Sequence, residues 1–268
     1  MAVRFLHSAD SAIIVEFGDR IDRSISDQVL ALAARMRPAA IAGVVDVVPT
    51  FRSLMVQYDP LLTSATNLVG AIEGLLTSAG ALERKRRLWH VPVCYESDFA
   101  PDLASVAWQT NLAPEEVVTL HAGTRYHVYM IGFVPGYPYM GDLPEALVLP
   151  RRADPRVRVP PGSVAIATTL TAIYPLESPG GWHLIGTTPI RIFDAVASPP
   201  ALFAPGDAVE FEAIDRNGFE AIRAAAERRD YRPAFTVAIL FEHTPAPGQP
   251  VCSDTTGLQS LHTRGQQA

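Results

Sequence analysis

Four arginines lie close together in the middle of this sequence, and their chemistry suggests a binding site. They are Arg151, Arg152, Arg156 and Arg158, with only Asp154 among them as an opposing charge. In an extended segment Arg156 and Arg158 point to the same side, because side chains alternate along a strand. Two guanidinium groups on one face suit a carboxylate or a phosphate, since each donates parallel hydrogen bonds. We therefore predict Arg156 and Arg158 as substrate-binding residues; the alternative is a solvated rim.

Two turn motifs follow the arginines. In Pro160-Pro-Gly-Ser163 the turn would expose backbone N–H groups, and the Ser163 hydroxyl could add a donor to a bound anion. The motif lacks the Gly-x-Ser-x-Gly frame of a hydrolase elbow, so Ser163 is predicted to bind substrate rather than to attack it. In Ser178-Pro-Gly-Gly-Trp-His183, the glycines permit close backbone approach and Trp182 is predicted as a pocket wall or as core.

Aromatic side chains concentrate in the same part of the chain. An apolar pocket with a few polar tips is the usual form of a small-molecule site. The same residues could instead present a protein-binding face, because tyrosine and tryptophan anchor interfaces. The predicted pocket residues, in addition to Trp182, are Phe133, Tyr137, Tyr139 and Tyr174.

Other chemistries find little support in the sequence. His121 and His127 lie six residues apart without a Cys/His cluster, so we predict no metal site. His121 ends a predicted helix, where a histidine usually packs in the core or meets the helix dipole. The chain has one lysine, Lys85, and no Gly-x-x-x-x-Gly-Lys-Ser/Thr loop, so it carries no P-loop for ATP.

Short strands are predicted to position these residues. The stretch 135–205 holds 13 of the 23 prolines, which disfavours long helices, and β-rich runs between Pro-Gly turns indicate a small barrel or sandwich. Residues 1–87 alternate in the order ββαββα, which predicts a ferredoxin-like α/β sandwich. A capping box at Ser24 is expected to start its first helix, which ends at Pro38. Residues 88–243 form the second domain, and 244–268 a flexible polar tail.

Composition limits the classes of function. The chain has 268 residues, 48% of them hydrophobic, and a formal charge of −6. These values are ordinary for a soluble globular protein and argue against general binding to nucleic acid or to a membrane surface. No apolar run is long enough for a membrane span, and the start lacks a signal-peptide core, so we expect a cytoplasmic location.

Blocks of glycine, proline and aromatic residues, in a fixed order, resemble the family of the 5-oxoprolinase B subunit. This family includes subunit 1 of allophanate hydrolase and a sporulation-kinase inhibitor. The resemblance spans roughly residues 3–215. The blocks that carry it include Val93-Cys-Tyr95, Pro101-Asp-Leu103, Tyr129-Met-Ile-Gly-Phe-Val-Pro-Gly-Tyr-Pro-Tyr139, Pro161-Gly-Ser-Val164, Ile173-Tyr-Pro175, Ser178-Pro-Gly-Gly-Trp182 and Ile185-Gly-Thr-Thr-Pro189.

The resemblance implies an α+β chain in which the sandwich is followed by a cyclophilin-like β-barrel. It also implies a non-autonomous enzyme subunit that works with subunits A and C, in a complex that uses ATP to hydrolyse 5-oxoproline to glutamate. Arg156 and Arg158 would fit a site for phosphate and carboxylate groups. Two alternatives stay open: a protein-binding inhibitor of a histidine kinase, and a subunit of allophanate or urea metabolism.

The sequence departs from the family pattern after the Gly-Ser-Val turn. The family usually shows Gly-Ile-Ala-Gly-x-Gln-Thr-Gly, whereas this chain reads Ala165-Ile-Ala-Thr-Thr-Leu-Thr-Ala172. Glycines are lost at Ala165, Thr168 and Ala172, and a glutamine amide is lost at Leu170. If that amide contacts substrate, the departure bears on activity and on the identity of the substrate.

Overall fold

The computed structural model describes residues 3–77, 81–243 and 260–261, and these divide into two compact units. The described residues up to Arg86, with those between Val237 and His262, form the first unit, and Arg87–Thr236 form the described part of the second. The sequence placed this boundary between residues 87 and 88 and kept the chain to residue 243 in the second domain. The tail expected at 244–268 lies outside the described residues, apart from 260–261.

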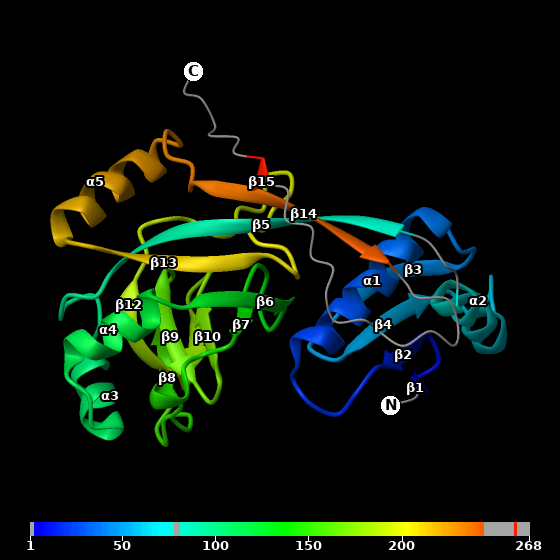
Figure 1. Cartoon of the computed structure of the whole chain (residues 1–268), viewed down its shortest axis with the longest axis horizontal. Coiled ribbons are helices and arrows are strands. Elements are labelled where there is room, and N and C mark those ends of the chain that lie inside the picture. The colour runs from blue at the N-terminus through cyan, green and yellow to red at the C-terminus, as the bar shows by residue number, and fades with distance from the viewer. Residues whose placement is uncertain (1–2, 78–80, 244–259, 262–268) are drawn as a thin grey trace. The chain divides into compact units, whose positions relative to one another are not determined.

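The first unit is a four-stranded antiparallel sheet with two helices (Figure 1). Its strand order is β1-β2-β4-β3, so each hairpin contributes one central and one edge strand. In chain order its elements are β1 (Arg4–Ser8), β2 (Ala12–Glu16), α1 (Arg23–Ala39), β3 (Val44–Pro49), β4 (Ser53–Tyr58) and α2 (Ala65–Thr77).

Helical spacing explains how α1 covers this sheet. Apolar residues recur three or four positions apart, which gives one buried stripe that packs on the inward side chains of β2 and β4. The helix begins earlier than its predicted capping box: Asp22 is the N-cap, and its Oδ1 accepts from the Ser24 amide at 2.9 Å. The stripe comprises Ile25, Val29, Leu32 and Met36.

The second unit contains a closed seven-stranded β-barrel. The strands follow the order β12-β9-β10-β7-β6-β13-β5, and a pair between Thr187 and Cys94 closes the ring. The predicted α+β class, an α/β sandwich followed by a β-barrel, is therefore confirmed. The barrel strands are β5 (Ala81–Cys94), β6 (Arg125–Ile131), β7 (Pro138–Gly141), β9 (Ser163–Ala167), β10 (Leu170–Ile173), β12 (His183–Thr187) and β13 (Ala208–Ile214).

Further elements surround the barrel strands. A two-stranded ribbon of β8 and β11 carries several of the predicted site residues, and α3 and α4 bury apolar side chains in the barrel core. In the described part of the chain no helix is both long and apolar enough to cross a membrane. The elements are α3 (Leu103–Thr110), α4 (Pro114–Ala122), η1 (Glu145–Leu147), β8 (Arg156–Val159), β11 (Ser178–Gly180), α5 (Arg216–Glu227), β14 (Phe235–His243) and β15 (Ser260–Leu261).

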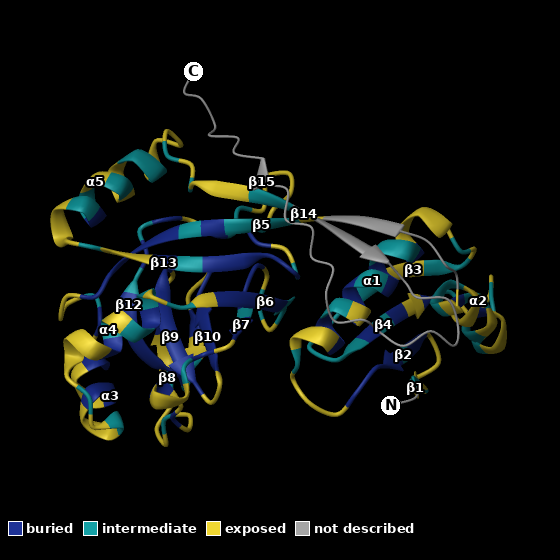
Figure 2. Cartoon of the chain, viewed as in Figure 1, coloured by how far each residue is buried: buried dark blue, intermediate teal, exposed yellow. Residues whose placement is uncertain are grey.

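A fully buried histidine lies in the mostly apolar barrel core. Figure 2 shows the barrel strands as mostly buried, whereas exposed residues gather on loops and on the outer faces of the helices. His121 is fully buried, lies on Phe211, and its two ring nitrogens contact the Tyr95 hydroxyl and Thr171 Oγ1, each at 2.9 Å. Burial lowers the pKa of His121 to about 3. His121 is therefore a neutral core residue, one of the two roles expected from its sequence position.

Candidate functional site: an aromatic cluster beside a buried ion-pair network

The five aromatic residues singled out in the sequence converge into one cluster. Tyr137 is at its centre: its ring centroid lies 5.0 Å from that of Tyr139, 5.1 Å from Tyr174, 5.5 Å from Phe133 and 6.3 Å from Trp182. Most of these contacts are edge-to-face, an arrangement that aromatic rings prefer. The residues come from three separate segments, so the barrel brings together what the sequence separates.

The cluster runs from the interior to the surface. Tyr137, Tyr174 and Trp182 are buried, Tyr139 is partly exposed, and Phe133 is 63% exposed. Phe133 also has a φ of 68°, a left-handed conformation that is unusual for a bulky residue. Such strained positions concentrate at functional sites, because the surrounding structure must compensate for their cost.

Hydroxyl groups meet inside the cluster. The hydroxyls of Tyr137 and Tyr174 share a hydrogen bond, and burial raises the pKa of both groups above the usual value. Burial likewise raises the pKa of Tyr139, while the positive charge of Arg151 opposes the shift at all three tyrosines. A Cβ at Gly180 would lie 2.2 Å from the Tyr174 hydroxyl oxygen, so only glycine fits there.

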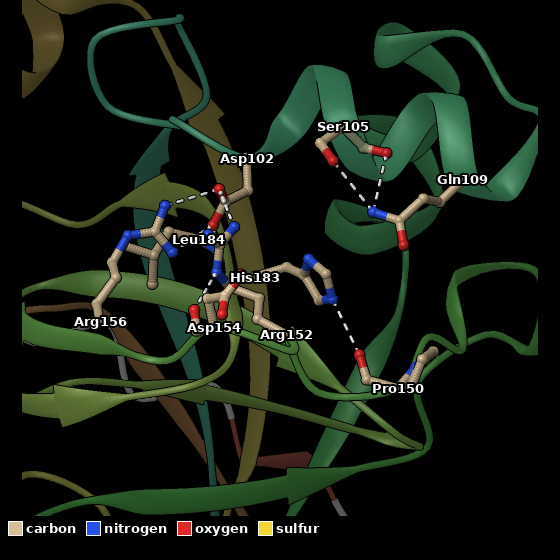
Figure 3. Close-up of polar contacts among 9 residues, drawn as sticks. All are labelled: Asp102, Ser105, Gln109, Pro150, Arg152, Asp154, Arg156, His183 and Leu184. Atoms are coloured by element: carbon tan, nitrogen blue, oxygen red, sulfur yellow. Dashed lines mark hydrogen bonds and ion pairs between the residues drawn. The ribbon is translucent and has the colours of Figure 1, made fainter.

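Asp102 organises a network beside this cluster (Figure 3). Its buried carboxylate accepts hydrogen bonds from Arg156 at 2.7 and 2.9 Å, from Arg152 at 2.9 Å and from the Leu184 amide at 2.7 Å. Burial alone would raise the pKa of Asp102, but these hydrogen bonds and the two arginine charges outweigh it and lower the pKa. The network ties the ribbon strand β8 to α3 and β12.

The two predicted arginines therefore have different partners. Arg156 is engaged by Asp102, and its side chain is 25% exposed. Arg158 is 76% exposed and pairs with Glu177 across the ribbon, through contacts of 2.8 to 3.0 Å. Both guanidinium groups thus already hold a carboxylate of this chain.

Ser163 begins β9 at the predicted turn. Its amide donates to the Pro160 carbonyl at 3.3 Å, and the Gly162 amide donates to the Tyr174 carbonyl at 2.7 Å. Ser163 is buried, and its carbonyl accepts from the Tyr174 amide at 2.9 Å. The turn amides expected to bind an anion are thus used within the fold: that of Gly162 holds Tyr174, and that of Ser163 closes the turn.

Two buried polar atoms near the cluster have no hydrogen-bond partner among the described residues. They are Oγ of Ser178 and Nδ1 of His183. Both belong to the segment that carries Gly180 and Trp182. Buried polar groups are usually paired, so unpaired ones in one segment are a feature that a bound ligand or water would explain.

The departures from the family pattern lie next to the same cluster. Ala172 is directly opposite Tyr139 on one side and Ala165 on the other, so the three side chains share one face of the sheet. Leu170 occupies that face two residues away, and it is buried. Thr168 forms the hairpin turn with a φ of 54°, a conformation that glycine adopts without strain.

Sequence reasoning missed two members of the site. Asp102 is distant from the arginines in sequence, and its role depends on tertiary contacts. Arg151 belongs to the arginine cluster of the sequence, but nothing in the local sequence distinguishes it from Arg152, because its lack of a partner depends on tertiary contacts. Within the described residues, no group of three or more His, Cys, Asp or Glu side chains could hold a metal ion.

Comparison with known proteins places the chain in a family. Residues 3–203 match the carboxyltransferase domain, subdomain C and D. The chain is 37% identical over 225 residues to the 5-oxoprolinase B subunit of Bacillus subtilis, covering 80% of this chain and 94% of that protein. It is 37% identical over 202 residues to the 5-oxoprolinase B subunit of Escherichia coli O157:H7, covering 75% and 92%.

A solved structure adds evidence for the fold. Kluyveromyces lactis urea carboxylase is 19% identical and superposes with a TM-score of 0.73, over 89% of this chain and 24% of that longer chain. At this identity the likeness shows the fold alone. The chain belongs to the carboxyltransferase-domain family, subdomains C and D, which includes the B subunit of 5-oxoprolinase.

Proposed function

We propose that this chain is the B subunit of an ATP-dependent 5-oxoprolinase, which converts 5-oxoproline to glutamate together with subunits A and C. The observation that carries the proposal is the match over nearly the whole length of two bacterial proteins that bear this name. The word "subunit" in their names supports a multi-subunit complex. The identity of the A and C partners is part of the proposal.

The chemistry requires activation of a stable cyclic amide. ATP would phosphorylate the lactam carbonyl oxygen and leave as ADP, and one water would add to the activated carbon. Cleavage of the C–N bond would then leave an acyl phosphate, from which a second water would release phosphate and glutamate. A site for these steps must hold the ring, exclude bulk water and place cations near the developing negative charge. This chain contains no P-loop, so we assign ATP to the complex as a whole.

The aromatic cluster is the part of the chain that fits a small ring. Tyr137, Tyr139, Tyr174 and Trp182 would form apolar walls with hydroxyl tips, and Phe133 would stand at the exposed side. Arg156 would support the site indirectly, because its bond to Asp102 fixes the position of the β8–β11 ribbon. Ser163 would support it by fixing the main chain of Tyr174. The unpaired Ser178 Oγ and His183 Nδ1 support a ligand close to this segment.

Reconstitution tests the function directly. Purified chain mixed with subunits A and C from the same source should form glutamate from 5-oxoproline, with one ATP consumed per ring opened. Omitting ATP or any one subunit should abolish the reaction. Failure of the three-subunit mixture to form glutamate, while the three Bacillus subtilis subunits do so under the same conditions, would contradict the proposal.

The alternatives from the sequence can be tested with the same material. Replacing 5-oxoproline by allophanate or urea tests a role in urea metabolism. Assaying the isolated chain against histidine-kinase autophosphorylation tests the inhibitor role. The exposed ring of Phe133 supports that second alternative, because exposed aromatics anchor interfaces.

A further inference from the structure

Three of the four clustered arginines are already paired, and one is not. Arg152 and Arg156 bind Asp102, and Arg158 binds Glu177. The guanidinium group of Arg151 forms no hydrogen bond or ion pair with any residue that the structure describes, and the residue is exposed. An unpaired guanidinium at the surface is free to bind an anion.

Two hydrogen bonds fix the main chain on either side of Arg151. The carbonyl of Pro150 accepts from Nε2 of His183 at 2.9 Å (Figure 3). The amide of Arg152 donates to the Gly181 carbonyl at 2.8 Å. The side chain of Arg152 extends to Asp102 at 2.9 Å, whereas that of Arg151 pairs with no residue that the structure describes. Arg151 is therefore held in place although no side chain pairs with it.

The segment that holds the Arg151 main chain also borders a tyrosine hydroxyl. Gly180, next to the residue that binds the Arg152 amide, lies directly against the Tyr174 hydroxyl. The charge of Arg151 also acts on the pKa of Tyr137, Tyr139 and Tyr174, which agrees with a position beside the cluster. A tyrosine hydroxyl both donates and accepts, so Tyr174 can donate to a ligand while it accepts from Tyr137.

We propose that Arg151, with the hydroxyl of Tyr174, binds the carboxylate of a small substrate whose ring or amide packs on the aromatic cluster. The guanidinium fork matches a carboxylate in geometry and charge. This inference rests on the proposed function for its preferred ligand, 5-oxoproline, which carries one carboxylate. It restricts the substrate class to small carboxylates, so allophanate would fit the site and neutral urea would not.

The experiment compares 5-oxoproline with 2-pyrrolidinone, the same lactam ring without the carboxylate. Isothermal titration of the full-length chain should show 5-oxoproline binding about ten- to a hundredfold more tightly, as expected for hydrogen bonds to a charged group. Arg151→Gln should abolish that preference, Arg151→Lys should restore part of it, and Tyr174→Phe should reduce it. Arg125→Gln removes an exposed charge on β6 and should leave the preference unchanged.

Steady-state kinetics of the reconstituted complex provide the second measurement. Arg151→Gln should raise KM for 5-oxoproline about ten- to a hundredfold. An unchanged KM in an active complex would overturn the carboxylate anchor and leave the proposed function intact. The complex could also lack activity while this chain still binds formate, allophanate or 5-oxoproline through Arg151. That outcome would overturn the proposed function and leave the carboxylate-binding role of Arg151 intact. A wild-type chain that binds none of these carboxylates would overturn the anchor.

Discussion

Arg151 and Arg152 are neighbours in sequence, yet they belong to opposite kinds of polar region. Arg152 joins Arg156 on a buried carboxylate, Asp102, whose four hydrogen bonds are supplied by this chain. Arg151 has no carboxylate partner among the described residues, and its charge acts on three tyrosine hydroxyls. The difference shows that a cluster of arginines does not itself identify a binding guanidinium; the position of the nearest carboxylate decides it.

The largest expected effect is a loss of stability when the paired network around Asp102 is disrupted. Asp102→Asn removes the charge that two partly buried guanidinium groups share, and breaking a buried pair costs about 3 kcal/mol or more. Urea denaturation followed by tryptophan fluorescence measures this loss in the barrel unit, because all three tryptophans lie there.

Asp154→Asn is the matched control, since Asp154 is exposed and should change stability by less than about 0.5 kcal/mol. If Asp102→Asn were as stable as that control, Asp102 would not organise the region, and the contrast between the two arginines would lose its basis.

A second prediction concerns the neutral histidine of the barrel core. Burial lowers the pKa of His121 to about 3. Below about pH 6.5 this histidine is therefore protonated in the unfolded chain but stays neutral in the folded chain. Stability is therefore lost as pH falls below 6.5, by about 1.4 kcal/mol per pH unit. Between pH 7 and pH 5 this contribution is about 2 kcal/mol.

The change of the unfolding free energy with pH is the measurement that isolates the contribution of His121. Unfolding free energies at pH 7, 6 and 5 should fall less steeply in His121→Gln than in the natural chain. His7→Gln, which alters an exposed histidine of the first unit, should keep the original slope. Equal slopes in all three proteins would mean that His121 is protonated in the folded barrel.

The smallest expected effect distinguishes Arg158 from Arg151. Arg158→Gln breaks an exposed ion pair with Glu177, and such pairs contribute about 0 to 1 kcal/mol. We expect kcat/KM of the reconstituted complex to fall less than about threefold. A loss of tenfold or more would support the anion-binding role that the sequence predicted for Arg158, with Glu177 released when substrate binds.

Local patterns predicted most of the fold. The stripe of Ile25, Val29 and Leu32 specifies which face of α1 is buried, and the Pro-Gly turns separate the barrel strands. The aromatic set was also identified correctly as one group, because the Tyr137–Tyr139 and Tyr174–Trp182 segments carry so many aromatics and glycines. Local patterns alone could not distinguish a barrel from a sandwich, since the Thr187–Cys94 pair that closes the ring joins distant segments; the family resemblance implied the barrel.

The partners of charged side chains were the hardest part to predict. The rule of alternation placed Arg156 and Arg158 on one face, but it could not show that Asp102 and Glu177 would reach them. Likewise, nothing in the local sequence showed that the amides of Gly162 and Ser163 would be used within the fold. Such pairings depend on segments that meet only in the tertiary structure.

The ring closure between β5 and β12 has a consequence for how the chain folds. The sandwich pairs β1 with β2 and β3 with β4 through short connections, so its contacts form between near neighbours. The barrel needs its first strand to find one of its last, and contacts of such long range slow folding because the intervening loop loses entropy before any contact stabilises it. During synthesis the sandwich should therefore mature first, and β5 should lack both of its ring neighbours until β12 and then β13 have emerged.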